Sequence, residues 1–592
     1  MCLTSPIFMR SAGPNTQGEL GGFAVAMARR QKVNVEILTY YAASLVAVMA
    51  IFILGHWIRY FVGRRKSQTS ILYPFLSVTR ISRKALLRKI PGFTSIGHAL
   101  VVTIFVALNA TFSFCRVDTS KASNFASRFG WMAAANMVLV VFLALKNTPL
   151  ALFTTYSYER LNKLHQIAGY TTLLYTILHG SIYAGYFIQI GKIELLREEI
   201  VTAGIILGFA VLITSLAGGI LRHFNYELFY IVHLALFGVI VVALGLHRPS
   251  FDGAKILVAT VFLASLWFTD RLLRFARLTW NGVNNKATVF PLPDGATRII
   301  FHKPLHRARP GKHCYVWLPH IRTFQTHPFT IVSSEPLELV INSFSGFTKD
   351  LHNYAQQNPG ASLTASLEGP YGTLPDPMDY DKVVLLAGGS GATFTFGIAA
   401  DMVERMNQES EKQIDFIWAT RSHDNIAWFA KHLNNLMLHE HSPKIALKLH
   451  LTRLPTTQPI TVPAPHSTSQ SSRTSTEAAS VSQTDEKHVI SIRTSSSTLR
   501  DRDMEKASNR PVLSGIEEIP KVIDYSHLPV THGRPDVEAM IRDAVSSTTK
   551  EQRILIAVCG PAGLVNAVRN TTASCISVGG PAIELHCEEF GW

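Results

Sequence analysis

The chain is 592 residues long; 47% of its residues are hydrophobic and 16% are charged. This length predicts three or four domains, and the apolar excess excludes a wholly soluble protein of this size. The net charge of +15 would suit nucleic-acid binding, but much of the basic charge flanks apolar segments, which is typical of membrane topology. We therefore expect a lipid bilayer, and no nucleic acid, as partner. The six cysteines lack metal-ligand or disulfide spacing, so we expect no zinc site or structural disulfide. The first thirty residues lack a clean apolar core with a cleavage site, so we expect no cleaved signal peptide.

Seven apolar stretches are long enough to cross a hydrocarbon core about 30 Å thick. The segment 63–89, after the first stretch, carries eight Lys or Arg residues, which predicts a cytoplasmic location. The loop 191–199 carries three glutamates and falls outside, although Arg29, Arg30 and Lys32 before the first stretch favour the opposite orientation. We place the N-terminus outside and the C-terminal half in the cytosol, and we expect the plasma membrane. The stretches are Ile37–Phe61, Ser95–Phe114, Trp131–Leu152, Leu161–Ile190, Ile200–Leu221, Tyr226–His247 and Ile256–Leu272.

Four histidines in the fourth and sixth stretches share one spacing. His165 and His179 are fourteen residues apart, and so are His233 and His247. Fourteen residues of α-helix rise about 21 Å and return to nearly the same face. On the alternating topology, His165 and His233 lie level near the cytoplasmic side, and His179 and His247 lie level near the outer side. This arrangement suits two stacked haems, each with two imidazole ligands and no open iron position.

A single buried histidine is more often a hydrogen-bonded core residue than a ligand. Ionisable residues inside a membrane are rare and tend to be functional, and four of them at one repeated spacing favour haem ligation. By contrast, His56 and His98 stand alone in other apolar segments, where we expect structural roles.

After Asn284 the pattern changes to short β-branched and aromatic runs, including Val289, Arg298–Phe301 and Tyr315–Leu318, which predict strands of a small antiparallel β-barrel. Two segments of this barrel would suit a flat ring system with a pyrophosphate tail. Ordinary strand and turn chemistry is the competing interpretation. The candidate residues for the ring are His327, Pro328, Phe329, Thr330 and Ser333, and those for the pyrophosphate, before a predicted helix, are Gly346, Phe347, Thr348 and Lys349.

The segment 383–393 predicts a buried parallel strand that runs into a glycine turn and a helix. Such turns let the backbone approach a phosphate at the helix N-terminus. Further strands are expected at 414–420, 445–452 and 554–558, and the last leads into a second glycine turn. Arg421 is a candidate partner for a 2′-phosphate, and a solvated surface arginine is the equal alternative. The turn residues are Gly388, Gly389, Ser390, Gly391, Ala392 and Thr393, and then Cys559, Gly560 and Pro561.

The segment from Pro455 to about Pro520 is rich in Ser and Thr and has few large apolar residues. It cannot bury enough surface to fold, so we expect a disordered insertion, either phosphorylated or a tolerated spacer. The predicted organisation is a tail, first span and basic loop (1–94), a transmembrane haem domain (95–275), a β-barrel domain (284–378) and an α/β nucleotide-binding domain (381–592) that contains the insertion.

The ordered set of motifs resembles the fungal ferric reductases, which are related to the superoxide-generating NADPH oxidases. The resemblance covers about residues 95–592 without the insertion, and rests on the four histidines, His327–Thr330, Gly388–Gly391, Cys559–Pro561 and the C-terminal Glu589–Trp592. It implies that the histidines ligate two b-type haems, that His327–Thr330 contacts FAD, that the two turns bind NADPH, and that Trp592 lies near the flavin. The chain departs from soluble relatives, which have Arg-x-Tyr-Ser or Arg-x-Tyr-Thr in place of His327–Thr330. Another residue must therefore compensate the negative charge of the pyrophosphate. Lys349 is a candidate, although the acidic Asp350 lies next to it in the sequence.

The resemblance implies a relay from cytosolic NADPH through FAD and two haems to an external acceptor, either a ferric chelate or siderophore or cupric ion, with an iron permease and multicopper oxidase as candidate uptake partners. No residue is expected to act as a general acid, base or nucleophile. A superoxide-generating oxidase is the alternative enzyme, but its second histidine pair is typically one residue closer than the first, whereas both separations here are fourteen. A non-catalytic transporter or receptor is the third interpretation, and intact haem and nucleotide motifs argue against it.

Overall fold

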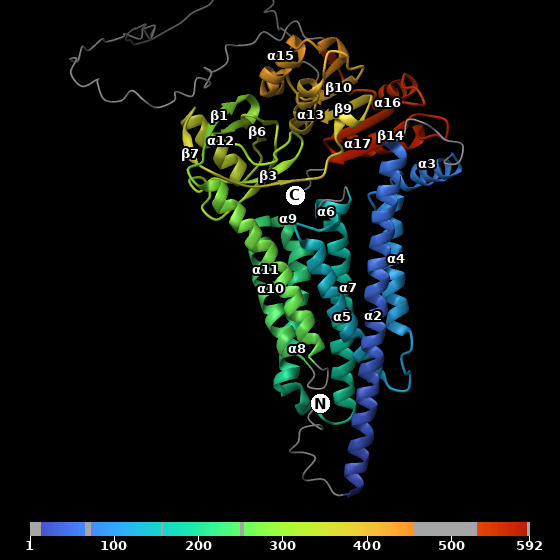
Figure 1. Cartoon of the computed structure of the whole chain (residues 1–592). Coiled ribbons are helices and arrows are strands. Elements are labelled where there is room, and N and C mark those ends of the chain that lie inside the picture. The colour runs from blue at the N-terminus through green and yellow to red at the C-terminus, as the bar shows by residue number, and fades with distance from the viewer. Residues whose placement is uncertain (1–13, 65–72, 155–157, 249–253, 454–529, 589–592) are drawn as a thin grey trace, which may run out of the picture. The chain divides into compact units, whose positions relative to one another are not determined.

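The computed structural model describes residues 14–64, 73–154, 158–248, 254–453 and 530–588. The predicted insertion at about 455–520 and the predicted flavin neighbour Trp592 lie outside these ranges. The described chain has a helical half, up to residue 282, and a soluble half of two further folded regions (Figure 1).

Within the described ranges, seven long helices form a bundle. Six of them are long and apolar enough to cross a membrane within the described ranges. The seventh, α7, is 32 residues long, but its Thr, Tyr, His and Gln residues lower its hydropathy. The helices are α2 (Pro14–Arg64), α4 (Ile96–Phe114), α5 (Ala122–Ala144), α7 (Tyr158–Gln189), α8 (Glu199–Leu216), α10 (Tyr226–Leu246) and α11 (Lys255–Gly282). Short pieces connect them: α6 (Leu150–Phe153), a π-helical turn at Ala217–Leu221 and α9 (Arg222–Phe224).

The third predicted span, Trp131–Leu152, is wrong in its limits, because α5 begins at Ala122 and ends at Ala144. The polar residues at its start are accommodated inside the bundle. Arg128 is 1% exposed and donates hydrogen bonds to the carbonyl oxygens of Phe112 (2.7 Å) and Cys115 (2.9 Å) and to Asn34 Oδ1 (2.8 Å). In the most apolar stretch of α5, 72% of the residues are buried, whereas only 11% are buried in the corresponding stretches of α4 and α10. The helix α5 is therefore the central one.

The bundle has one end that contacts the soluble half, which we call the proximal end; the opposite end is the distal end. At the proximal end, Lys146 follows α5 and lies 3.2 Å from the centre of the Tyr315 ring. Tyr158, the first residue of α7, is hydrogen bonded through its hydroxyl to Tyr315, and Arg274 in α11 is paired with Glu368. The start of α7 and the ends of α5 and α11 are therefore proximal.

The first soluble region contains two antiparallel sheets around one core. One sheet has the order β5-β6-β2-β1-β7 and the other β4-β3-β8. Both contribute buried residues to that core, including Ile299 and Leu339 from the first and Val316 and Leu367 from the second. The strands are β1 (Lys286–Leu292), β2 (Ala296–Phe301), β3 (His313–Trp317), β4 (His327–Thr330), β5 (Ser333–Ser334), β6 (Leu337–Asn342), β7 (Ser362–Thr364) and β8 (Ser366–Tyr371), with α12 (Phe347–Gln357) packed on them.

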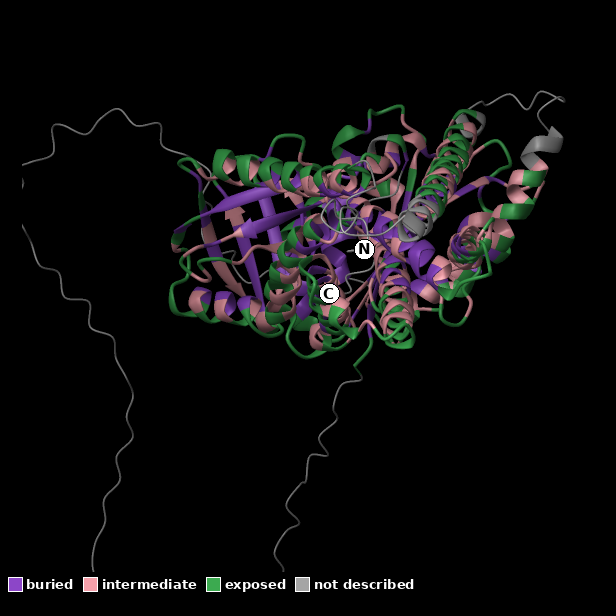
Figure 2. Cartoon of the chain, turned by 90° about the horizontal axis from the view of Figure 1, so that it is seen from below, coloured by how far each residue is buried: buried purple, intermediate pink, exposed green. Residues whose placement is uncertain are grey.

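The second soluble region is a parallel six-stranded sheet in the order β12-β11-β10-β9-β13-β14. The central residues of β9, β10 and β13 are buried, which explains their continuous apolar sequences. Figure 2 shows buried strands inside the molecule and exposed residues on the outer helices and loops. Strand order changes direction between β9 and β13, and open α/β sheets bind ligands at such a point. The elements are β9 (Lys382–Gly388), α13 (Ala392–Arg405), β10 (Gln413–Thr420), α14 (His423–Ile426), α15 (Ala430–Leu438), β11 (Ile445–Leu451), β12 (Val530–His532), α16 (Val537–Ser546), β13 (Arg553–Cys559), α17 (Ala562–Cys575) and β14 (Ala582–Glu588).

The basic segment predicted at 63–89 contains the amphipathic helix α3 (Tyr73–Leu87). Arg80 donates hydrogen bonds to the carbonyl oxygens of Val578 and Gly580, and Arg83 forms an ion pair of 2.9 Å with Glu584. This helix therefore lies against the region of the parallel sheet, on the same side of the bundle as the rest of the soluble half.

Candidate functional site

The two histidine pairs of the sequence analysis come together in the bundle as two imidazole pairs. The ring centres of His165 and His233 are 6.3 Å apart, and those of His179 and His247 are 5.9 Å apart. A metal bonded to two imidazole nitrogens, each at about 2 Å, places the ring centres roughly 6 Å apart. The spacing within each pair therefore suits one iron between two rings.

Three of these histidines use their other ring nitrogen on a helix carbonyl. The Nδ1 of His165 lies 2.9 Å from Val140 O, that of His179 lies 2.8 Å from Ala126 O, and that of His247 lies 2.7 Å from Ile200 O. Metal-bound histidines commonly donate a hydrogen bond from the N–H of their other ring nitrogen to a carbonyl. This hydrogen bond orients the ring and leaves Nε2 for the metal. The donor set and its support therefore fit haem iron.

Two glycines that the sequence analysis did not single out make room for the distal pair. A Cβ on Gly130 would lie 2.6 Å from His179 Cε1, and one on Gly204 would lie 2.4 Å from His247 Cε1. Each glycine stands four residues after the carbonyl that its histidine contacts, Ala126 or Ile200. A sequence signal existed: small residues at 130 and 144, and at 204 and 218, repeat the fourteen-residue histidine spacing.

The residues predicted to contact a flat ring lie on and beside β4. His327 stacks on Phe347 with ring centres 4.3 Å apart, and Phe329 lies 6.0 Å from the same ring. Phe347 is 2% exposed and belongs to the barrel core, so its side chain packs inside the barrel. Burial lowers the pKa of His327, against the opposing charge of Glu227, which favours a neutral ring at neutral pH.

The predicted pyrophosphate segment begins α12 as expected, with Gly346 at φ +59 before Phe347. Asp350 is held by Arg322, whose Nε and Nη2 donate to Oδ2 at 2.9 and 2.6 Å. Its negative charge is thus compensated, which removes the objection to Lys349. Lys349 is exposed, Thr348 and Ser333 are half-buried, and Thr330 is buried.

The two glycine turns are brought together at the switch point of the parallel sheet. A Cβ on Gly391 would lie 2.3 Å from Cys559 O, and one on Gly388 would lie 2.7 Å from Pro561 Cδ. Gly389 has φ +56, a conformation that favours glycine, and Gly391 precedes α13. Arg421 directly follows β10 and is exposed. The backbone arrangement suits a phosphate at the N-terminus of α13.

A buried polar cluster joins the bundle to the barrel, and the sequence analysis missed it. Arg274 Nε and Nη2 donate to Glu368 at 2.7 and 3.0 Å, and Tyr371 donates to the same carboxylate. Burial alone would raise the pKa of Glu368, but the hydrogen bonds and charge of Arg274 outweigh it and lower that pKa. Burial lowers the pKa of Lys146, and the charge of Arg274 adds to this effect. His313 Nε2 lies 2.8 Å from Glu159 Oε1, which adds a second link to α7.

Known protein families match the same three regions. The family "Ferric reductase like transmembrane component" matches residues 129–244, an "FAD-binding domain" matches 281–374, and the "Ferric reductase NAD binding domain" matches 380–573. Membrane-spanning helices followed by these two domains define a class of transmembrane flavin- and nicotinamide-dependent oxidoreductases. Within that class, this chain belongs to the ferric reductase family.

Similar proteins include ferric reductase transmembrane component 3 of Saccharomyces cerevisiae, which is 25% identical over 85% of this chain and 67% of its own length. A probable cell surface ferric reductase of Aspergillus oryzae is 27% identical over 62% of this chain and 55% of its own length. Ferric/cupric reductase transmembrane component 2 of Saccharomyces cerevisiae is 25% identical over 84% of this chain and 66% of its own length. The chain thus spans about two thirds or less of these relatives. A solved flavohemoglobin from Malassezia yamatoensis is 15% identical over 80% of this chain and 99% of its own, with a TM-score of 0.35, too low to bear on fold or function.

Proposed function

We propose that this chain is an NADPH-dependent ferric-chelate reductase of the plasma membrane, with cupric ion as a second candidate acceptor. The FAD-binding and nucleotide-binding regions would lie in the cytosol, and the acceptor would be reduced at the distal end of the bundle. The observation that carries the proposal is the stack of two imidazole pairs, with centre separations of 6.3 and 5.9 Å, inside helices that begin or end at the flavin barrel.

FAD takes an electron pair from a nicotinamide and releases electrons singly, and bis-imidazole haems carry single electrons. The residues of the chain would set the order in which the nucleotide, the flavin and the two haems are bound. The turns at Gly388–Gly391 and Cys559–Pro561 would hold the nucleotide, and His327–Thr330 would hold the flavin ring. His165 and His233 would ligate the proximal haem, and His179 and His247 the distal haem. Because two imidazoles would hold each iron, the acceptor would not bind to iron directly.

The acceptor is inferred from the relatives, whose names are ferric or ferric/cupric reductase. Siderophores are further candidate acceptors, and a permease with a multicopper oxidase is a candidate uptake system for the product. Oxygen is the competing acceptor. The equal fourteen-residue spacing of both histidine pairs favours metal over oxygen.

The proposal is tested with purified full-length protein, NADPH, and ferric–EDTA, cupric ion and oxygen compared as acceptors. We expect rapid ferric reduction that persists without oxygen, and a b-type haem band in the reduced-minus-oxidised spectrum. Superoxide formation that persists without metal, together with no ferric reduction, would assign the chain to the oxidases. Absence of the haem band would favour a non-catalytic protein.

Gly391→Ala tests the proposed nucleotide site. The added Cβ would overlap Cys559 O, at 2.3 Å, and force the two glycine turns apart. Because small misplacements at such sites cost about 100-fold, we expect the KM for NADPH to rise by that order. Gly563→Ala is the matched control, since a Cβ on Gly563, in the first turn of α17, meets nothing within 4 Å. Equal KM values for the two variants would contradict the site.

A further inference from the structure

The distal end of α2 carries basic residues where membrane topology does not call for them. Positive residues concentrate on the cytoplasmic side of membrane proteins, yet Arg29, Arg30 and Lys32 lie at the end of α2 remote from the soluble half. Arg30 has structural partners, because its Nη1 donates to Ser123 O and Asn124 Oδ1. Lys32 is exposed and lines a cavity, so its charge requires a different explanation.

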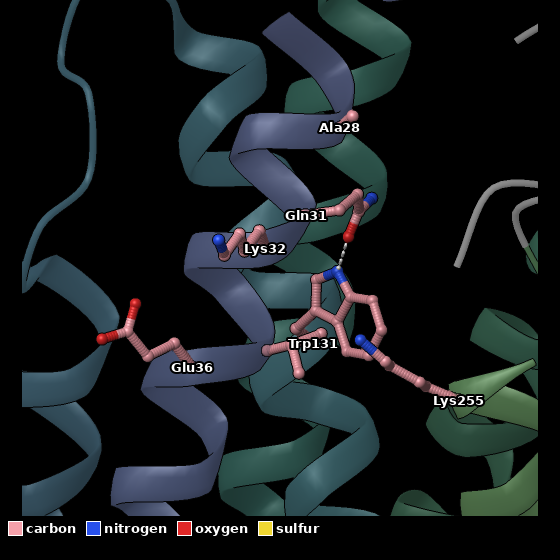
Figure 3. A pocket seen from close by; sticks show the side chains of 7 residues that line it. Ala28, Gln31, Lys32, Glu36, Trp131 and Lys255 are labelled. Atoms are coloured by element: carbon pink, nitrogen blue, oxygen red, sulfur yellow. Dashed lines mark hydrogen bonds between the residues drawn. The ribbon is translucent and has the colours of Figure 1, made fainter. Parts of the chain in front are cut away.

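That cavity lies between α2, α5 and the first residue of α11, and has a volume of about 380 Å³. Trp131 forms its wall on α5 and donates a hydrogen bond of 2.6 Å from Nε1 to Gln31 Oε1. Figure 3 shows the side chain of Lys255 extended toward this indole. Small-molecule sites have volumes of roughly 300–1,000 Å³ and a few placed polar groups, so the cavity suits one small ligand.

The cavity is electropositive. Lys32 and Lys255 contribute two ammonium groups. The one carboxylate among its lining residues, Glu36, forms an ion pair of 2.9 Å with Arg116 Nη1 and accepts a hydrogen bond from Tyr40. Because Arg116 compensates Glu36, the two lysines leave a net positive charge for an anion.

The cavity lies at the distal edge of the hydrocarbon core. The apolar part of α2, Val25–Phe61, has 37 residues, whereas about 20 residues suffice to cross the core. Counted back from Arg59 near the proximal end, a core of about 20 residues reaches to about Tyr40, so the cavity residues 28–36 lie at its distal edge. On α11, Lys255 precedes Arg274 by nineteen residues, a rise of about 28 Å from the soluble half.

The cavity also adjoins the distal histidine pair. Gly130, the chain neighbour of Trp131, contacts His179. Trp131, Ile256 and Leu244 share one packed cluster, and Leu244 stands three residues before His247. The Trp131 side chain and the adjoining turns of α5 and α10 therefore lie between the cavity and the distal pair.

From these observations we propose that the Lys32–Trp131–Lys255 cavity binds the acceptor, and that the acceptor is a metal chelate of net negative charge, such as a polycarboxylate complex of Fe(III). This rests on the proposed function, which supplies the electron. One electron passes to the ferric ion and makes it ferrous, while no bond of the chelating ligand breaks and no proton is taken up. The lysines bind the carboxylates, and Trp131 sets the approach to the distal pair.

The test compares two one-electron acceptors of opposite charge on purified full-length protein: anionic ferric–EDTA and cationic hexaammineruthenium(III). Removing an exposed charge from such a site costs a few-fold in affinity. We expect Lys255→Gln to raise the KM for ferric–EDTA about fivefold, and Lys255→Glu to raise it about tenfold while lowering the KM for the ruthenium complex. Lys192→Gln, in the 191–199 loop and absent from the cavity wall, is the control and should change neither KM by more than about twofold.

Binding without turnover separates this inference from the proposed function. Redox-inert gallium(III)–EDTA is titrated into the protein without NADPH by isothermal titration calorimetry, and we expect the wild type to bind it more tightly than Lys255→Glu. Chelate reduction with the same KM in the wild type and both Lys255 variants would overturn the cavity assignment alone. Lysine-dependent gallium–EDTA binding with no NADPH-driven reduction would retain the anion site and overturn the proposed function.

Discussion

His179→Ala is expected to remove ferric-chelate reduction almost completely while the flavin still accepts electrons from NADPH. The imidazoles of His179 and His247 lie with ring centres 5.9 Å apart, and no other imidazole pairs with His247 among the described ring contacts. Loss of a neighbour that merely supports a ligand costs about 10–100-fold in metal affinity or activity. Loss of the ligand itself should therefore lower chelate reduction by about 100-fold or more.

The measurement has two parts: the haem content of purified protein and the rate of flavin bleaching by NADPH under anaerobic conditions. We expect the haem band to fall by about half, because the pair His165–His233 is intact, and the flavin to bleach at the wild-type rate. His98→Ala is the matched control, since His98 lies in α4, where its Nδ1 contacts Thr94 Oγ1, and should retain both haems. Full chelate reduction by His179→Ala would refute the two-haem relay.

Glu368→Gln is expected to destabilise the junction between the bundle and the flavin barrel more than any surface ion-pair substitution. The side chains of Arg274 and Glu368 are only 10% and 3% exposed. Removing one partner of such a pair leaves the other charge buried and unpaired, at a cost of about 3–5 kcal/mol. The variant also weakens the acceptor that Tyr371 uses.

The checking experiment is thermal unfolding of the detergent-solubilised protein. Glu538→Gln is the control. The side chains of Glu538 and its ion-pair partner Arg542 are 62% and 54% exposed, and such exposed pairs contribute less than about 1 kcal/mol. The double variant Arg274→Met, Glu368→Gln should recover part of the loss, since no uncompensated charge remains. A melting temperature of Glu368→Gln equal to that of Glu538→Gln would show that the pair does not hold the junction.

Much of the architecture follows from local sequence periodicity. The strands predicted at 414–420 and 554–558 agree with β10 (Gln413–Thr420) and β13 (Arg553–Cys559), because a buried parallel strand is a continuous apolar run. Span 95–114 agrees with α4, whose N-cap Ser95 accepts a hydrogen bond from His98 N. The start of α5 was misplaced because hydropathy cannot recognise an arginine that finds three hydrogen-bond acceptors inside a bundle.

The sequence by itself determined the four histidines, their pairing and the two glycine turns, because helical periodicity and strand–turn–helix order are properties of neighbouring residues. Only the tertiary structure decided what surrounds them. Gly130 and Gly204 matter because His179 and His247 pack against them. Lys255 and Trp131 line the same cavity although 124 positions separate them in the chain. Such contacts depend on how helices pack against one another. The fourteen-residue repeat of small residues marks the two glycines, but it does not show which side chains lie against them.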